Sequence, residues 1–295
     1  MSLLIAAVLG VVQALTEFLP VSSTAHLLVF GELFGQRLGD DRFRAFVAII
    51  QLGTTLAVIV YFREELSRLI QAALQGLAAG KPLGTPSARL AWLIVLGTVP
   101  AAVAGKLLER RIEALGNVTI AFSLVVWGLI LLAAERLARH RRTIADVALG
   151  DALAIGCGQA LALVPGTSRS GATITTGMAL GLKREDAARF SFLLSVPITL
   201  GAGLYKLRKV LPALSGHRDW ALATVVGTVV ALGAGYLVIG WLLAYLRSRT
   251  TYVFVAWRIA AGLLIGILLW RGVLPTTGDE APAPSHAPSA RASAP

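Results

Sequence analysis

The sequence predicts an all-α polytopic membrane protein with two inverted repeats, each a re-entrant helical hairpin plus three transmembrane helices. The first observation is composition: the 295 residues are 56% hydrophobic and only 15% charged, with a mean hydropathy of +0.74. Soluble domains carry roughly a quarter charged residues. The second observation is a pair of polar, proline-interrupted apolar segments, one in each half. The third is an internal repeat that relates the two segments.

Six apolar runs approach the roughly 20 residues needed to cross a bilayer. We place these spans at 45–62, 89–107, 118–134, 188–205, 219–246 and 253–271. With the two broken segments, they make residues 1–274 a single integral-membrane domain. Residues 275–295 are rich in Pro, Ala and Ser and cannot form a core, so we expect a disordered tail.

The charge distribution argues against nucleic-acid binding. Net charge is +11, but the basic residues lie in short connections between apolar runs, where they contact lipid head groups. They divide almost evenly between the two sides of the predicted topology, so the positive-inside rule does not orient the chain. Cys157 is the only cysteine, which excludes an intramolecular disulfide.

The internal repeat consists of three blocks that match in the same order, with the first two offset by about 145 residues. Gln13-Ala14-Leu15 matches 159–161, Phe46 and Thr55 match Phe190 and Thr199, and 97–105 matches 227–235. We place repeat one at about 1–134 and repeat two at about 148–271. Because each unit crosses the membrane an odd number of times, the second is inverted, and the two hairpins meet near the membrane midplane.

The first broken segment, residues 13–26, reads QALTEFLPVSSTAH. Pro20 lacks a backbone N–H and ends a half-helix, and Ser22 and Ser23 stand where the next helix takes its N-cap. Glu17 and His26 are ionisable residues at membrane depth, where they are costly and indicate function.

His26 follows the two serines by about one helical turn. A histidine beside a hydroxyl can activate a serine nucleophile; it can equally deprotonate water, protonate a leaving group, or serve the structure alone. The choice between the serines stays open, because either could merely cap a helix. The predicted catalytic residues are Glu17, Ser23, His26 and Ser22.

The second broken segment, residues 159–171, reads QALALVPGTSRSG. Pro165 ends a half-helix, and the helix that starts near Thr167 and Ser168 offers free N–H groups and a positive dipole to an anion. Arg169 is the only basic residue in either break and suits phosphate contact. The alternative is that Arg169 pairs with Glu17 for structure. The predicted phosphate-binding residues are Arg169, Ser168, Thr167, Ser170, Gly166 and Thr173.

Gln13 and Glu17 are four residues apart and share a helix face. A bare carboxylate beside a phosphate in low dielectric is repulsive, which a bridging divalent cation would relieve. Mg²⁺ typically takes one or two carboxylates plus substrate phosphates. We therefore predict a divalent cation, Mg²⁺ or Ca²⁺, at Glu17 and Gln13; the alternative for Gln13 is a helix–helix hydrogen bond.

These two motifs together, Gln13-x-x-x-Glu17-Phe-Leu-Pro-Val-Ser-Ser-Thr-x-His26 and Pro165-Gly-Thr-Ser-Arg-Ser-Gly-x-Thr173, resemble the bacitracin-resistance type of undecaprenyl-diphosphate phosphatase. The resemblance extends over about 1–274. It implies hydrolysis of the C55 prenyl diphosphate to its monophosphate, which recycles the cell-wall lipid carrier. It also implies a bacterial plasma-membrane enzyme, often a homodimer, with an outward-facing active site that depends on Mg²⁺ or Ca²⁺.

On the matching positions, the resemblance makes Glu17 metal- or water-handling, Ser23 and His26 catalytic, and Arg169 with Ser168 phosphate-holding. Gln13 stands where many members have glutamate. A rival class is a polyprenyl-phosphate flippase or secondary transporter, because inverted repeats with broken helices are also transporter architecture. A transporter needs charge complementarity but no general base, so the hydroxyl–His–Glu cluster favours the enzyme.

Overall fold

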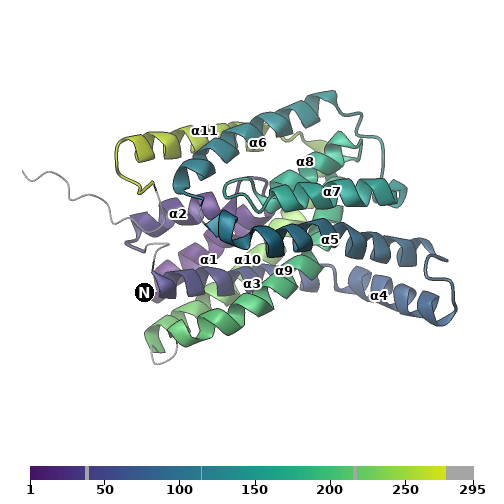
Figure 1. The fold of residues 1–295 in the computed structure, drawn as a ribbon, viewed down its shortest axis with the longest axis horizontal. Coiled ribbons are helices and arrows are strands. Elements are labelled where there is room, and N and C mark those ends of the chain that lie inside the picture. Colours follow the sequence, from purple (N-terminus) through teal and green to yellow (C-terminus); the bar gives the residue numbers. More distant parts are fainter. Residues whose placement is uncertain (37–39, 114, 215–217, 277–295) are drawn as a thin grey trace, which may run out of the picture.

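The computed structural model describes residues 1–36, 40–113, 115–214 and 218–276, and it is an all-helical bundle (Figure 1). The α-helices in chain order are α1 (Leu3–Phe18), α2 (Ser23–Leu33), α3 (Asp41–Tyr61), α4 (Arg63–Ala78), α5 (Pro86–Glu113), α6 (Asn117–Leu137), α7 (Leu149–Leu161), α8 (Arg169–Ala179), α9 (Arg184–Leu214), α10 (Arg218–Ser248) and α11 (Tyr252–Trp270). A single 3₁₀ turn, η1 (Ile144–Asp146), precedes α7.

Six of these helices, α3, α5, α6, α9, α10 and α11, are long and apolar enough to cross a membrane. They coincide with the six predicted spans, which confirms the polytopic all-α class. The tail predicted at 275–295 lies outside the described residues apart from Pro275 and Thr276. The repeat boundaries stay predictions.

The two broken segments form helical hairpins, α1–α2 and α7–α8. Their helices contain 16, 11, 13 and 11 residues. At 1.5 Å per residue these helices are about 16 to 24 Å long, short of the ~30 Å hydrocarbon core. Each hairpin therefore has the dimensions of a re-entrant element that enters and leaves on one side.

Glycines at equivalent repeat positions join each hairpin to the opposite unit. Gly10 of α1 lies so close to Gly227 of α10 that a Cβ would collide with its carbonyl oxygen, and Gly156 of α7 meets Gly97 of α5 in the same way. Each hairpin thus packs on the second span of the other unit. This exchange supports a two-fold relation between the units; their inversion across a membrane stays a prediction.

Helix α4 breaks the equivalence, because unit one carries it between its first and second spans. Arg63, Glu64 and Glu65 open the helix, and Leu69 is its one buried apolar side chain. Glu65 accepts a hydrogen bond from Arg189 Nη2 of α9 at 2.8 Å, which ties α4 to the bundle. The sequence analysis, which looked for long apolar runs, did not predict this amphipathic helix.

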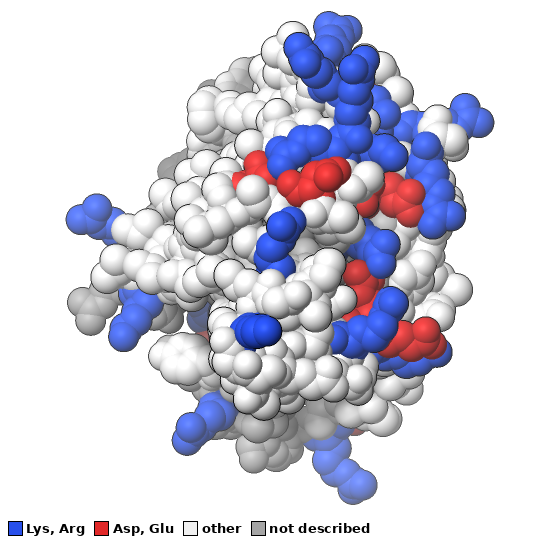
Figure 2. Space-filling model, turned by 90° about the vertical axis from the view of Figure 1, so that its right-hand side faces the viewer, with Lys and Arg blue, Asp and Glu red and all other residues white. Residues whose placement is uncertain are grey.

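Figure 2 shows the end of the bundle opposite the N-terminus, where acidic and basic side chains interleave. The ion pairs there include Arg142–Asp151, Arg184–Glu135, Arg189–Glu65 and Arg247–Glu185. Arg142 also donates to the carbonyl of Leu180 and so joins the start of α7 to the end of α8. Its hydrogen bond to the Asp151 carboxylate lowers the pKa of that group. This network closes the base of the second hairpin.

Candidate active site

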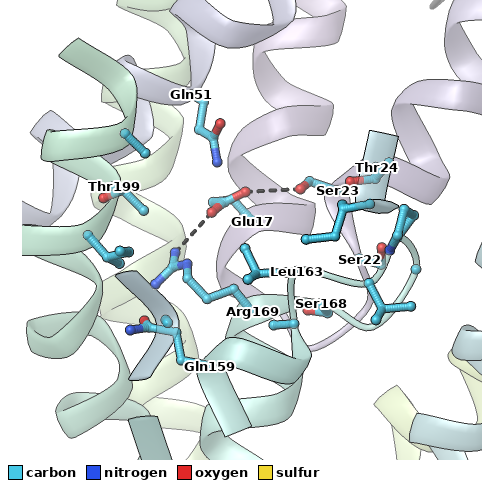
Figure 3. A pocket seen from close by; sticks show the side chains of 18 of the residues that line it. Glu17, Ser22, Ser23, Thr24, Gln51, Gln159, Leu163, Ser168, Arg169 and Thr199 are labelled. Carbon is cyan, nitrogen blue, oxygen red and sulfur yellow. Dashed lines mark hydrogen bonds and ion pairs between the residues drawn. The ribbon is translucent and has the colours of Figure 1, made fainter. Parts of the chain in front are cut away.

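The two breaks meet inside the bundle, with Glu17 near the end of α1 and Arg169 at the start of α8 (Figure 3). Arg169 Nη2 lies 2.9 Å from Glu17 Oε1, and both side chains are largely buried. Residues 152 positions apart in the chain therefore form one ion pair. The structural pairing that the sequence left open does exist.

Ser22 and Ser168 are the N-caps of α2 and α8, and both adopt a positive φ, 77° and 70°. A non-glycine residue in such a conformation costs of order 1–3 kcal/mol and persists only where its surroundings impose it. The Ser168 hydroxyl accepts a hydrogen bond from Gly171 N at 3.1 Å, whereas Ser22 makes no side-chain cap. The same strained backbone conformation thus precedes the first residue of both α2 and α8.

The Glu17 carboxylate has three side-chain partners. Besides Arg169, it accepts hydrogen bonds from Ser23 Oγ at 2.9 Å and from Gln13 Nε2 at 3.2 Å, both on Oε2. Two of these contacts are visible as dashed lines in Figure 3. The carboxylate is therefore charge-compensated, which removes the repulsion that a bare carboxylate would exert on a phosphate.

Arg169 retains hydrogen-bonding capacity. Its Nε and Nη1 atoms are buried and have no partner among the described residues. Gln159 Nε2 and Oε1 are likewise without a partner among the described residues, and Gln159 lines the same cavity as Arg169 (Figure 3). Unsatisfied buried donors of a cation are costly, and a phosphate oxygen would satisfy them.

A cavity of about 360 Å³ holds this cluster. Its walls include six predicted site residues: Glu17, Ser22, Ser23, Gly166, Ser168 and Arg169. They also include polar residues that we did not predict, among them Gln51 of α3 and Thr199 of α9. Lys206, further along α9, lines the cavity as well. The repeat contained a signal for Thr199, because it matches Thr199 with Thr55. In the structure these two equivalent threonines form a hydrogen bond at 3.2 Å.

A profile of the family described as "Bacitracin resistance protein BacA" matches residues 6–264. The undecaprenyl-diphosphatase of Anaeromyxobacter dehalogenans (strain 2CP-1) is 71% identical over 282 residues, 96% of each chain. The protein of the same name from Myxococcus xanthus (strain DK1622) is 52% identical over 95% of this chain and 94% of its own. The chain belongs to the BacA family. That membership confirms the family to which the two motifs pointed.

In this BacA-family chain, His26 does not line the cavity. Its Nε2 lies 2.8 Å from Trp257 Nε1, and its Nδ1 lies 2.7 Å from the Ser22 carbonyl oxygen. Since an indole N–H only donates, Nε2 accepts and Nδ1 carries the proton to Ser22. Both nitrogens are occupied away from Glu17 and the serine hydroxyls. A catalytic role for His26 stays a prediction without support from this geometry.

Three predicted phosphate ligands also lie behind the cavity wall. Ser170 Oγ donates to the Leu19 carbonyl at 3.1 Å, and Thr173 Oγ1 lies 2.6 Å from Ser191 Oγ. Thr167 Oγ1 is buried without a partner among the described residues. Ser170 and Thr173 are thus engaged in joining α8 to its neighbours, and the phosphate-binding roles of all three stay predictions.

The sequence analysis missed Arg258 of α11, which is 1% exposed and lies against both breaks. Its Nη1 donates to the Pro20 carbonyl of the first break at 3.0 Å. Its Nη2 donates to the Thr167 and Gly166 carbonyls of the second break at 2.8 and 3.2 Å. The side chain also contacts carbonyls of α6. The available signal was its charge within the last apolar span of a BacA-family sequence.

Among the described residues, no group of three or more His, Cys, Asp or Glu side chains could hold a metal ion. The available set beside Glu17 is the Gln13 amide oxygen, a buried acceptor with no partner in the described chain. One carboxylate plus one amide oxygen fits the sparse set with which Mg²⁺ binds when substrate phosphates and water supply the other ligands.

Proposed function

We propose that this protein is an undecaprenyl-diphosphatase that hydrolyses undecaprenyl diphosphate to undecaprenyl phosphate and inorganic phosphate, and so recycles a lipid carrier of the bacterial cell wall. One observation carries the proposal: Glu17 and Arg169 meet across the two breaks, and two guanidinium nitrogens remain without partners in the described chain. The names of the relatives support the same activity.

Arg169 would bind the diphosphate through these unpartnered N–H groups, because charge-assisted hydrogen bonds to phosphate are among the strongest in proteins. The start of α2, which no side chain caps, would face the same anion with its positive dipole. Both groups are in place before the substrate arrives, so they would stabilise negative charge that develops on phosphorus-bound oxygens without reorganising.

Ser23 and Glu17 form the nucleophile–base pair in this proposal. The hydrogen bond from Ser23 Oγ to Glu17 Oε2 places the proton acceptor beside the hydroxyl. Ser23 Oγ would bond to the terminal phosphorus, its proton would pass to Glu17, and the bond to the bridging oxygen would break. Water would then release phosphate from the serine. In the alternative, Glu17 takes the proton from a water that attacks phosphorus directly.

A divalent cation, Mg²⁺ or Ca²⁺, would be held by Glu17 and the Gln13 amide oxygen and would supply positive charge to the diphosphate. We further propose a bacterial plasma-membrane location with an outward-facing site and a homodimeric state, all three implied by the family resemblance.

The test is phosphate release from C55 prenyl diphosphate by the detergent-purified protein, with Mg²⁺ and with EDTA. We expect release that EDTA stops and that Glu17→Gln lowers about 1,000-fold, while Glu64→Gln, a change at an exposed carboxylate on α4, leaves the rate unchanged. Release that survives EDTA would retain the enzyme and reject the cation. No release from folded protein would reject the proposal, and transport of a polyprenyl phosphate would then support the rival class.

A further inference from the structure

Equivalent helix pairs of the two units differ in how closely they pack. α3 and α10 approach through glycines: a Cβ on Gly53 would collide with the Thr228 carbonyl, and one on Gly235 would lie 2.9 Å from Ala57 Cβ. The equivalent pair, α9 and α5, instead has two hollows along its seam. One is the active-site cavity, to which Ala101 and Ile198 contribute. One side of the two-fold arrangement is therefore closed, and the other is open.

The second hollow is a groove of about 320 Å³ between α4, α5 and α9. Its walls are apolar side chains from all three helices, including Leu66, Ile70 and Leu74 of α4 and Val95 of α5. The indole of Trp92 also lines it, with a buried Nε1 that has no partner in the described part of the chain. This lining has no charged side chain and suits a hydrocarbon chain.

The groove and the active-site cavity are neighbours along the seam. On α9, Pro197 lines the groove and the next residue, Ile198, lines the cavity. On α5, Val95 lines the groove, and Ala101, about 9 Å further along at the helical rise, lines the cavity. Each helix has a proline where the two hollows adjoin, Pro100 on α5 and Pro197 on α9. Proline removes a backbone hydrogen bond and bends a helix, which favours separation of the two helices there.

Helix α4 forms the outer wall of the groove. It lies beside spanning helices, and the apolar side chains that it exposes are the ones that line the groove: Ile70 is 58% and Leu74 61% exposed. A surface in water would not favour such exposure, so we infer that the open side of the groove faces lipid. The groove is thus placed between the bilayer and the site of phosphate binding.

We propose that the α4–α5–α9 groove binds the isoprenyl tail of the lipid diphosphate whose head group occupies the cavity at Arg169. The inference rests on the proposed function and deepens it, because it names the part of the protein that selects long-chain substrates. A polar cavity beside an apolar groove matches a molecule with a charged head and a long hydrocarbon tail. The other occupants to be tested are an acyl chain of any bilayer lipid and a second copy of the chain.

The decisive variant is Ala73→Trp, which fills the groove from α4 and changes no residue of the cavity. Gln75→Trp, exposed on the same helix and outside the groove lining, is the matched control. We expect Ala73→Trp to raise the KM for C55 prenyl diphosphate about tenfold, which corresponds to loss of contact for about two methylenes. Hydrolysis of C5 isopentenyl diphosphate should not change in either variant. Equal losses for both substrates, or for neither, would overturn the proposal.

A second measurement does not require turnover. A C55 prenyl diphosphate that carries a photoreactive group in its tail is bound in EDTA, irradiated, and the labelled peptides are identified by mass spectrometry. We expect labels on α4, α5 and α9 that Ala73→Trp suppresses and Gln75→Trp retains. Equal labelling by a phospholipid with the same photoreactive tail, cross-linked dimers at α4, or labels on other helices only would overturn the proposal. If the labels appear as expected but the protein releases no phosphate in the assay with Mg²⁺, the phosphatase activity is rejected and the binding of the tail in the groove is retained.

Discussion

The two breaks share a scaffold and differ in chemistry. Each contains a glutamine, a proline and an N-cap serine with positive φ. At the first position of the following helix, however, the first break has Ser23 and the second has Arg169. The carboxylate of Glu17 has its repeat equivalent in Leu163, an apolar residue. The two repeats therefore share the same backbone architecture. The first carries the carboxylate and hydroxyl, Glu17 and Ser23, and the second carries the guanidinium of Arg169.

This division explains why the site forms only between the units. A carboxylate and a guanidinium buried separately would each be strongly destabilising, and each compensates the other when the breaks meet. Repeat symmetry alone would have placed like charges together. The difference between the copies is thus the source of both the stability of the site and its capacity to bind an anion.

The largest effect should come from a double-mutant cycle across the breaks. Arg169→Gln should lower kcat/KM about 1,000-fold, because a preorganised charge partner of the phosphates is lost. Glu17→Gln should have a comparable effect. The double variant Glu17→Gln/Arg169→Gln should recover thermal stability, because no buried charge remains unpaired, and yet stay inactive. Stability is measured by thermal unfolding in detergent and activity by phosphate release. Recovery of activity together with stability would mean that the pair is only structural.

Arg258→Lys tests whether the two breaks must be held together. Lysine has three donors and no planar fork, so several of the carbonyls that Arg258 now binds would lose their partner. We expect about 3 kcal/mol lower stability from unsatisfied buried acceptors. We also expect about a 100-fold lower kcat, because small displacements of catalytic groups are costly. Arg271→Lys, at the exposed end of α11, is the control. A variant with lower stability but full kcat would assign Arg258 to the fold alone.

Substitutions at the repeat-equivalent glutamines Gln13 and Gln159 should differ in their effect on the affinity for a divalent cation. Gln13→Glu adds a second carboxylate beside Glu17, so the Mg²⁺ concentration for half-maximal activity should fall about tenfold, since ligand charge tunes affinity. Gln159→Glu, which changes a cavity residue of the other break, should leave that concentration unchanged. Titration of phosphate release with Mg²⁺ measures both. An equal shift in the two variants would contradict the assignment of the cation to the first break.

The smallest expected effect is the difference in stability gain between glycine substitutions at the two strained serines, Ser22 and Ser168. Ser22→Gly should raise stability by about 1 kcal/mol, because glycine accepts a positive φ without strain. Ser168→Gly should give less, because it also removes the cap on Gly171 N. Melting temperatures in detergent would show this order. Unchanged activity in Ser22→Gly and loss in Ser23→Ala would assign the nucleophile role to Ser23, and the reverse pattern would contradict the pairing of Ser23 with Glu17.

Several features could be predicted from residues alone because they depend on local pattern. The six spans follow from runs of apolar residues, and the hairpins follow from Pro20 and Pro165, each of which interrupts an apolar run just before a cluster of hydroxyl residues. The cost of burying Glu17 and Arg169 in a membrane pointed to a shared site before any contact was known. Helix α4 was not predicted because charged residues lie between its apolar residues, so it contains no long apolar run and resembles many loops in sequence.

By itself, the sequence determined the class of the protein, the position of the two breaks, and the kind of ligand that hydroxyls and one arginine would attract. Only the tertiary structure decided which side chains face the cavity. It turned His26 towards Trp257, placed Gln51 and Thr199 on the wall, and put Arg258 across both breaks. The physical reason is that side-chain direction in a bundle depends on how helices distant in the chain pack, and helical periodicity specifies a face without specifying what that face meets.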